Sequence, residues 1–386
     1  MDKQPHRTIH YETDVPAAPG PSRTQAFIEA FARNRLAAAG FVIFVIFFIT
    51  AVAGVFLTSG SNPVLDPAMV RLQEKLKPPL SVPDVQVLRP EEVPASGRYL
   101  LGTDDLGRDV FARMLQGAWV SLTVGFVAVG ISVFIGIFLG GIAGYFGQIN
   151  LSAGHILAAT FAGASVLSAA AGLPAAAFAF GGGILLCLWA SFGENTPSRR
   201  PKAIGRVLAK GMISVDTLIM RLVDIMLCFP SFFLILTVVA LLPASIYNIM
   251  IVIGLTSWMG AARFVRAEFL SLREQDFVVA AKALGVGDLR IIFRHIMPNA
   301  IAPVVVSATI GIATAILTEA GLSFLGFGVP PPHATWGNIL SDGKRFIFDA
   351  PWLTFTPGIA ILVVVLCFNL FGEGLRDALN PKLKER

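Results

Sequence analysis

The 386-residue chain is too apolar to be an ordinary soluble protein. Apolar residues make up 55% of it and charged residues only 14%, whereas a soluble domain is about one quarter charged. So little charge excludes a soluble enzyme of this size and a disordered chain. Long apolar stretches instead predict an all-α polytopic membrane protein. The net charge of +5 then indicates Lys/Arg-rich cytoplasmic loops and not the binding of nucleic acid.

The N-terminal part is predicted to be a tail, one membrane span and a large outer loop. Residues 1–35 are polar and are interpreted as a cytoplasmic tail. Residues 36–57 are apolar and form roughly 33 Å of helix, which is enough to cross a bilayer. Arg33 and Arg35 precede this span and favour a cytoplasmic N-terminus. Residues 58–117 contain seven Lys/Arg and eight Asp/Glu. Because they lack an excess of positive charge, they are placed on the outer side of the membrane. The family resemblance described below would make this loop periplasmic.

The next apolar segments predict a second span and an additional hairpin. The second span, residues 119–146, returns inward and has Gly136, Gly140 and Gly144 on one helical face. In membrane helices such a face lets another helix approach closely. Residues 156–192 are apolar with a Gly/Pro break in the middle, and a cluster of Lys and Arg follows them. They are expected to form a pair of short spans with both ends in the cytoplasm.

Four further spans are expected in the rest of the chain. They cover residues 215–242, 244–262, 299–317 and 353–371. Arg221 and Asp224 lie three residues apart on one face of the first of these spans and are expected to form an ion pair. Pro230 should kink the same helix. Residues 118–386 are therefore a transmembrane core, and six spans plus the inserted pair are predicted in total.

The most informative stretch is the predicted cytoplasmic loop 276–298. Apolar residues recur at helical spacing in two segments, first at Phe277, Ala280, Ala281 and Leu284 and then at Leu289, Ile292, Phe293 and Ile296. Gly285 and Gly287 separate the two segments. Asp288 can cap the second helix, and Pro298 suits the first turn of the next span. Two short amphipathic helices of this kind lie on the membrane or on their own protein, or dock in a groove of a partner. The pattern alone favours neither.

This loop resembles the "EAA" loop of bacterial ATP-binding-cassette (ABC) importer permeases. The family pattern is E-A-A-x3-G-x9-I-x-L-P. The chain matches it at Ala280, Ala281, Gly285 and Pro298. Val279, His295 and Met297 stand where Glu, Ile and Leu are usual, so the chain keeps the Ala-Ala-Gly arrangement without the acidic residue.

Four further segments resemble permeases of dipeptide, oligopeptide and nickel importers of the "C" subunit type. They are residues 101–109 (LGTDDLGRD), 220–224 (MRLVD) with 229–230 (FP), 319–328 (EAGLSFLGFG) and 372–381 (GEGLRDALNP). Five matches in the same order along the chain indicate membership of this family. Residues 148–213 do not fit the resemblance, because the family passes almost directly from the second span to the span with Arg221 and Asp224. They are interpreted as an insert.

The resemblance implies the type I ABC importer permease fold, with six core transmembrane helices, and a role as half of a membrane pore. A homologous second permease would form the other half. Two ABC ATPase subunits, which bind ATP and Mg themselves, would dock on the EAA-like loop. This chain would then need no cofactor and catalyse no reaction. A periplasmic solute-binding protein would deliver the solute, by default a peptide, to a multi-pass protein of the bacterial inner membrane with both termini in the cytoplasm.

Three groups of candidate functional residues follow. The ATPase-coupling residues are Phe277, Ala280, Ala281, Leu284, Gly285, Asp288, Ile292, Phe293 and Pro298. The structural ion pair is Arg221 with Asp224. The candidate contact with the binding protein consists of Thr103, Asp104, Asp105 and Arg108. Capping of the following helix by Thr103 or Asp104 is the alternative role of that segment. No ligand set has calcium-loop spacing, so no metal site is predicted.

Two alternative functions stand beside the importer. A stand-alone secondary transporter needs carboxylates inside the membrane for ion coupling. The acids closest to the spans are Asp216, Asp224, Glu319 and Glu373, and all four lie near predicted span ends, which favours the importer. The same importer architecture can also serve a nickel chelate, an opine or an oligosaccharide, and the sequence does not separate these solutes from peptides.

Overall fold

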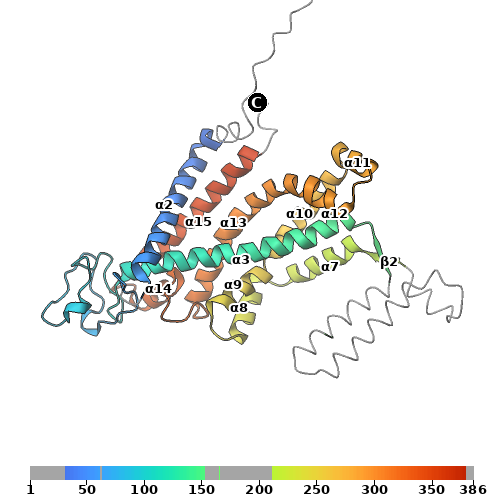
Figure 1. The fold of residues 1–386 in the computed structure, drawn as a ribbon. Coiled ribbons are helices and arrows are strands. Elements are labelled where there is room, and N and C mark those ends of the chain that lie inside the picture. Colours follow the sequence, from blue (N-terminus) through green and yellow to red (C-terminus); the bar gives the residue numbers. More distant parts are fainter. Residues whose placement is uncertain (1–30, 61–62, 153–164, 166–210, 380–386) are drawn as a thin grey trace, which may run out of the picture.

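The computed structural model describes residues 31–60, 63–152, 165 and 211–379, and most of them are helical (Figure 1). The long helices are α2 (Arg35–Thr58), α3 (Val110–Phe146), α7 (Val215–Cys228), α8 (Ser231–Leu241), α9 (Ile246–Leu255), α10 (Trp258–Arg273), α13 (Met297–Phe324) and α15 (Trp352–Leu379). The short helices are α11 (Asp276–Ala283), α12 (Asp288–Ile291) and α14 (Trp336–Gly343), with 3-10 turns at Leu72–Glu74, Pro90–Glu92 and Lys344–Phe346 and a π-helical turn, η4, at Ile292–Ile296. Two short strands are β1 (Asn150–Ser152) and β2 (Gly211–Ser214).

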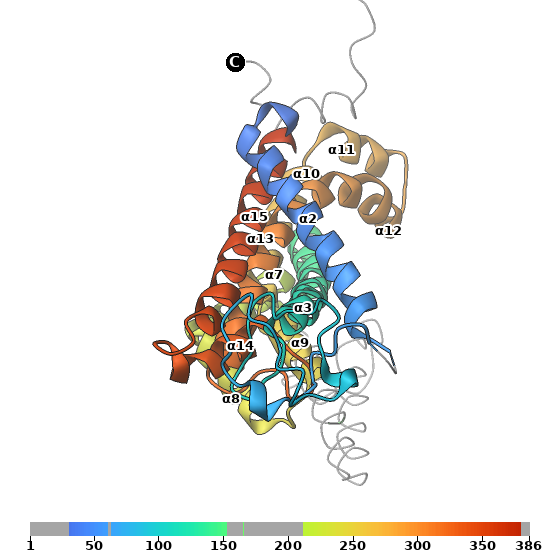
Figure 2. The ribbon, with the colours of Figure 1, turned by 90° about the vertical axis from the view of Figure 1, so that its left-hand side faces the viewer.

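The long helices run back and forth between two ends of the molecule (Figures 1 and 2). One end has the pair α11–α12, the start of α2 and the end of α15, and we call it the α11–α12 end. The opposite end has the folded segment 63–109 and α14, and we call it the loop end. α3 and α13 both connect the two ends, and α2 packs along α15. The fold thus separates two polar regions by a layer of apolar helices.

Among the described residues, five helical segments are long and apolar enough to cross a membrane. They are α2, α3, α9 with α10 (Ile246–Arg273), α12 with α13 (Asp288–Phe324), and α15. The pair α7 and α8 is a sixth span if its two bent halves are counted as one. The predicted helical membrane fold is therefore confirmed. The helices are longer than the apolar windows predicted, with α3 beginning at Val110, because hydropathy detects only the part that matches the hydrocarbon layer.

Pro230 breaks its span completely, where the sequence predicted only a kink. Phe229 has an extended backbone (φ −87°, ψ 133°), the conformation favoured before proline. The helix begins again at Ser231, and the axes of α7 and α8 differ by 82°. The physical reason is that Pro230 has no amide to donate and its ring excludes a helical conformation at Phe229.

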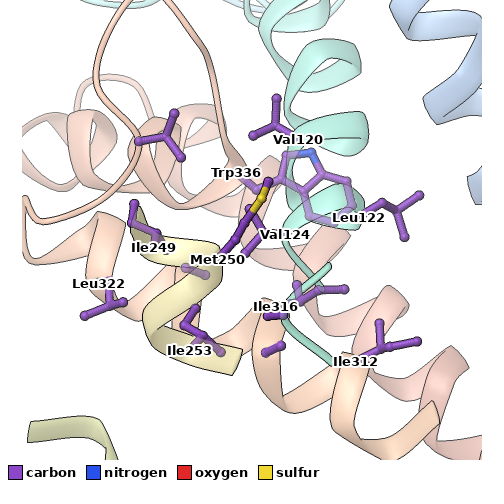
Figure 3. Packing of buried hydrophobic residues seen from close by; sticks show 14 of the residues in the cluster. Val120, Leu122, Val124, Ile249, Met250, Ile253, Ile312, Ile316, Leu322 and Trp336 are labelled. Atoms are coloured by element: carbon purple, nitrogen blue, oxygen red, sulfur yellow. The ribbon is translucent and has the colours of Figure 1, made fainter. Parts of the chain in front are cut away.

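The main apolar core lies toward the loop end, between α3, α9, α13 and α14 (Figure 3). Val124 of α3, Ile253 of α9 and Ile316 of α13 are each at most 2% exposed. Trp336 of α14 packs in the same cluster and donates its indole N–H to the carbonyl oxygen of Met114 at 3.1 Å. Because α14 contributes both a buried ring and a hydrogen bond, it is a fixed part of the bundle.

The glycine face of α3 makes the close approach that its spacing predicted. It packs against α10. A Cβ at Gly136 would lie 2.5 Å from the Cβ of Ala261, and one at Gly140 would overlap the carbonyl oxygen of Ala262. At Gly144 a Cβ would lie 2.5 Å from the Cβ of Phe269. The backbones of α3 and α10 are therefore in direct contact over two helical turns.

The ends of the insert meet in a two-stranded antiparallel sheet. Asn150 pairs with Ser214 and Ser152 with Gly211. The family-like core thus enters and leaves the insert at one place. Apart from Ser165, residues 153–210 lie outside the described residues. The hairpin predicted at residues 156–192 falls within this segment.

We predict that Gly140→Ala destabilises the assembled protein and that Gly130→Ala does not. The new methyl group at position 140 has no room beside Ala262, and overpacking costs about 1–3 kcal/mol. Gly130 lies on the same helix, and a methyl group there would meet no packing neighbour within 4 Å, so it is a matched control. The measurement is the thermal midpoint of the purified protein in detergent. Equal midpoints for both variants would show that the α3–α10 contact can accommodate an extra methyl group, which contradicts direct backbone contact.

We also predict that residues 153–210 can be replaced by Asn-Gly without loss of the core. The strands already run antiparallel to the point where Ser152 faces Gly211, and Asn-Gly is the preferred two-residue connection of such a pair. The shortened protein should reach the membrane and retain part of its transport. A control deletion that also removes β1 and β2 should do worse. Complete failure of the Asn-Gly variant to assemble would contradict the prediction.

Candidate functional site

A glycine turn joins α11 to α12. The amide of Gly285 donates to the carbonyl of Lys282 at 2.9 Å, and the amide of Val286 donates to the carbonyl of Ala281 at 3.1 Å. Together these bonds form a Schellman motif, which requires a left-handed residue after the helix. Gly285 has a φ of 76°, where a Cβ would be unfavourable. The predicted break at Gly285 is therefore confirmed.

The inward face of the pair packs on its own subunit. The apolar cluster includes Val278 and Ala281 of α11, Ile291 of α12, Ile292 and Ile296 of η4, Tyr145 of α3, and Val265 and Phe269 of α10. The expectation that Ala281 and Ile292 face a partner is wrong, because they are only 6% and 9% exposed. They attach the helix pair to the bundle instead.

Polar contacts reinforce this attachment at the end of α3. The hydroxyl of Tyr145 donates to Oδ1 of Asp288 at 2.6 Å, and Nζ of Lys282 lies 5.1 Å from the centre of the tyrosine ring. Arg273 donates to the carbonyl oxygens of Gly144 and Tyr145 at 3.4 and 3.3 Å. Asp288 was expected to cap α12, but the cap position belongs to Gly287 and the Asp288 side chain binds Tyr145. These contacts join the pair to both α3 and α10.

The outward face of the pair is apolar and exposed. We define it as Phe277, Ala280, Leu284, Leu289 and Phe293. Leu284 is 84% exposed and Phe293 is 66% exposed. The exposed side chains Arg290 and Arg294 lie beside this face. Exposed apolar groups with a basic rim are typical of an interaction surface. One apolar face of α11 thus packs on its own subunit, and a second apolar face remains exposed.

A π-helical turn, η4, leads from α12 into α13. The amide of Met297 donates to the carbonyl of Ile292, five residues back. Pro298 occupies the first turn of α13, as predicted, and has no amide for the carbonyl of Arg294. Within this turn Ile292 is buried against the bundle, whereas Phe293 is exposed.

Asp224 has a different main partner from the one predicted. Its Oδ1 accepts from NH2 of Arg263 on α10 at 2.6 Å, whereas Oδ2 is 4.0 Å from NH1 of Arg221. A second carboxylate of α7, Asp216, binds Nε and NH2 of Arg266. Two ion pairs therefore fasten α7 to α10. The predicted pair with Arg221 is only a peripheral contact, since 4.0 Å is beyond hydrogen-bond distance.

At the loop end, two glycines fold the segment 101–109 tightly. Gly102 and Gly107 have φ values of 79° and 73°. A Cβ at Gly102 would lie 2.5 Å from the carbonyl oxygen of Lys77, and one at Gly107 would overlap the carbonyl oxygen of Arg71. The LGTDDLGRD motif is thus explained by a close backbone approach that only glycine permits.

Asp104 is the centre of a charged cluster that joins three elements. Its Oδ2 accepts from Nε of Arg108 at 2.6 Å and from NH1 of Arg113 at 2.5 Å. The NH2 groups of both arginines also reach Oδ2 of Asp342 on α14, at 3.2 and 3.0 Å. Arg113 lies in the first turns of α3. The cluster therefore ties the folded segment, α3 and α14 together.

Two of the four candidate binding-protein residues are inaccessible. Thr103 and Asp104 are fully buried; the Thr103 hydroxyl donates to the carbonyl of Glu74 at 2.5 Å. Neither residue caps α3, because that role belongs to Asp109, whose Oδ1 accepts from the amide of Phe111. Burial raises the pKa of Asp109 above its usual range. Thr103 and Asp104 are structural, and only Asp105 and Arg108 can meet a partner.

A polar cavity of about 440 Å³ opens beside the charged cluster. Asp105, Arg108 and Arg113 line one side, and Asp342 of α14 and residues 330–332 line the other. Oδ1 of Asp105 is buried and has no hydrogen-bond partner among the described residues. Burial raises the pKa of the Asp105 carboxyl, and the nearby carboxylates Asp104 and Asp342 raise it further.

Sequence reasoning did not single out Glu319 as a buried group. It lies in α13 near the loop end and is fully buried. Its Oε1 accepts from the hydroxyl of Ser323 at 2.6 Å, and its Oε2 accepts from that of Ser121 on α3 at 3.4 Å. Thr335, the cap of α14, donates to Ser323 in turn. The spacing of Glu319 and Ser323 on one helical face could have indicated this bond.

A groove on α13 also escaped the sequence analysis. Two cavities of about 570 and 270 Å³ lie along this helix and share Ser307 and Ile310. The smaller one continues past Thr314 to Thr318, with α3 and the α9–α10 junction as its walls. Small and hydroxyl-bearing residues at positions 307, 311, 314 and 318 fall on one face of α13. No grouping of His, Cys, Asp and Glu suited to a metal ion occurs in the described part of the chain.

These features define a polytopic membrane permease with an attached helix pair at one end and a folded polar segment at the other. Residues 203–385 match the family described as binding-protein-dependent transport system inner membrane component. A dipeptide transport system permease protein of Alkalihalophilus pseudofirmus is 36% identical over 91% of this chain and 88% of its own length. An oligopeptide transport system permease protein of Bacillus subtilis is 32% identical over 76% of this chain and 74% of its own.

The chain belongs to this family of ABC importer permeases. It is a transmembrane subunit of a binding-protein-dependent transport system of the inner membrane, with the type I importer permease fold. A dipeptide permease protein of Haemophilus influenzae shares 35% identity over 74% of this chain and 75% of its own length. The family consists of transport proteins, and its name implies a solute-binding protein as a partner.

Proposed function

We propose that this chain forms half of the pore of a peptide importer and that partner ATPases drive it through α11–α12. The observation that supports this most is the outward face, which is apolar and exposed on a helix pair that is otherwise attached to α3 and α10. A helix in the groove of a partner buries such a face. The inward face packs on the subunit's own helices, but the outward face has no such contact within the described residues.

The pair is suited to transmit force from the ATPase subunits. Its inward face and the Tyr145–Asp288 bond attach it to α3, and Val265 and Phe269 attach it to α10. When ATP and Mg close the ATPase dimer, the docked pair would be displaced. Because the pair is packed on two spans, these spans would follow it. In this proposal the partner ATPases bind and hydrolyse ATP, and this chain takes no part in that reaction.

Charge supports an orientation with the α11–α12 end in the cytoplasm. Arg290, Arg294 and Lys282 are exposed there, and cytoplasmic loops are enriched in Lys and Arg. At the loop end acids balance the bases. Both the start of α2 and the end of α15 lie at the α11–α12 end, so the polar segments that flank these two spans would also be cytoplasmic.

The groove on α13 is proposed as this subunit's share of the solute path. In the smaller cavity Ser307, Thr314 and Thr318 supply hydroxyls, which suit the polar backbone of a peptide. The larger cavity also has the charged residues Glu268 and Arg376 on its wall. A homologous second permease would cover the open side of the groove. Peptides are preferred over chelates, opines or sugars because relatives are named as dipeptide, di/tripeptide and oligopeptide permeases.

The loop end is proposed as the surface that receives the solute-binding protein. It lies opposite α11–α12 and is held rigid by the Asp104 cluster and by α14. A rigid surface costs less conformational entropy on docking than a mobile one. Asp105 and Arg108 are the residues of the predicted contact that remain partly exposed there.

We predict that Phe293→Asp and Leu284→Asp leave the permease in the membrane but release the ATPase subunits. A carboxylate on the outward face must be desolvated on docking, whereas in the free subunit it is already in water. Co-purification of the ATPases should fall strongly, and peptide uptake at least about tenfold.

Phe348→Asp is the matched control. Phe348 is also an exposed phenylalanine, 96% accessible, but it lies at the loop end. This variant should retain its ATPase subunits. Normal co-purification of ATPases with the Phe293 and Leu284 variants would contradict the docking assignment.

A further inference from the structure

The charged cluster at the loop end contains one carboxylate more than it contains guanidinium groups. Asp104, Asp105 and Asp342 face Arg108 and Arg113. The two arginines bind Asp104 and Asp342 at distances of 2.5 to 3.2 Å. Asp105 is the carboxylate that no cation binds within hydrogen-bond distance, since NH2 of Arg108 is 4.0 Å from its Oδ1. The local excess of one negative charge therefore lies on the wall of the 440 Å³ cavity.

The geometry around Asp105 leaves one acceptor position open. The closest cationic nitrogen, NH2 of Arg108, is 4.0 Å from Oδ1, which is beyond hydrogen-bond distance. The same nitrogen already donates to Asp342 at 3.2 Å. Oδ1 is itself buried and has no hydrogen-bond partner in the described part of the chain, and a buried oxygen left unsatisfied is unfavourable. A cation that entered the cavity and bound it would relieve that penalty.

The walls of the cavity are held in place independently of any partner. Asp104 fixes the turn before Arg108 by accepting from the amides of Leu106 and Arg108, both at 2.9 Å. On the other side, α14 is anchored through Trp336 and through Asp342. The open acceptor thus lies in a shaped site and not on a mobile loop.

We propose that a lysine or arginine side chain of the solute-binding protein enters this cavity and binds Asp105. The inference rests on the proposed function of the loop end as the surface that meets that protein. A cationic side chain fits the charge excess and the unpartnered oxygen. The amino terminus of the transported peptide is the less favoured source of the cation, because no residue that lines this cavity also lines the two cavities along α13.

The test measures the dissociation constant between the assembled ABC complex and its binding protein. Asp105→Asn removes the negative charge and keeps the shape, so the dissociation constant should rise about tenfold at low salt. The increase should shrink as salt screens the contact in the unsubstituted complex. Glu91→Gln is the matched control, because it removes an exposed acid from the same segment outside the cavity and should leave binding unchanged.

The binding protein is tested both empty and loaded with dipeptide. If its own side chain supplies the cation, Asp105→Asn weakens both forms equally. Weakening of the loaded form alone would assign the site to the amino group of the peptide and overturn the proposal. Unchanged binding of both forms would overturn it while leaving the proposed function intact. Failure of the unsubstituted complex to bind the protein at all would overturn the proposed function and the inference together.

Discussion

The direct backbone contact between α3 and α10 is the constraint that positions the other helices and both candidate sites. In a membrane, apolar surface gains nothing by leaving lipid for another helix, so close packing of small residues has to hold the helices together. Gly136, Gly140 and Gly144 allow α10 to lie against α3 with no side chain between the backbones. The two ion pairs from α7 then add a third helix to the same unit.

This contact makes α3 the link between the two candidate sites. The helix has 37 residues and is about 55 Å long. At one end Tyr145 binds Asp288 of the α11–α12 pair, and at the other Arg113 binds Asp104 and Asp342. One continuous helix therefore connects the pair with the loop end. Under the proposed function, the same helix would connect the ATPase subunits with the surface that meets the binding protein.

The sequence predicted the features that are local and failed where partners are distant. Hydropathy located the spans, and the glycine spacing of α3 and the turn at Gly285 were correctly anticipated because each depends on neighbouring residues. The pairing of Asp224 with Arg263 was missed because it joins two helices 39 positions apart. Ala281 and Ile292 were assigned to the wrong side because α11–α12 carries apolar residues on two faces, and their spacing does not say which face meets the bundle. Thr103 and Asp104 are polar, so the sequence suggested that they are exposed. They are buried because segment 63–109 folds over them.

The most direct test of the account is whether α11–α12 and α3 move as one body. Spin labels at Ala283 on α11 and Phe138 on α3, in a protein whose cysteines are replaced by serine, would report their separation in the assembled complex. Both positions are exposed and lie off the outward face. Trapping with ATP should shorten the distance between the ATPase subunits while this separation changes by less than about 2 Å. A change of about 5 Å, a full helical turn, would show that the pair slides on α3 and would contradict the rigid link.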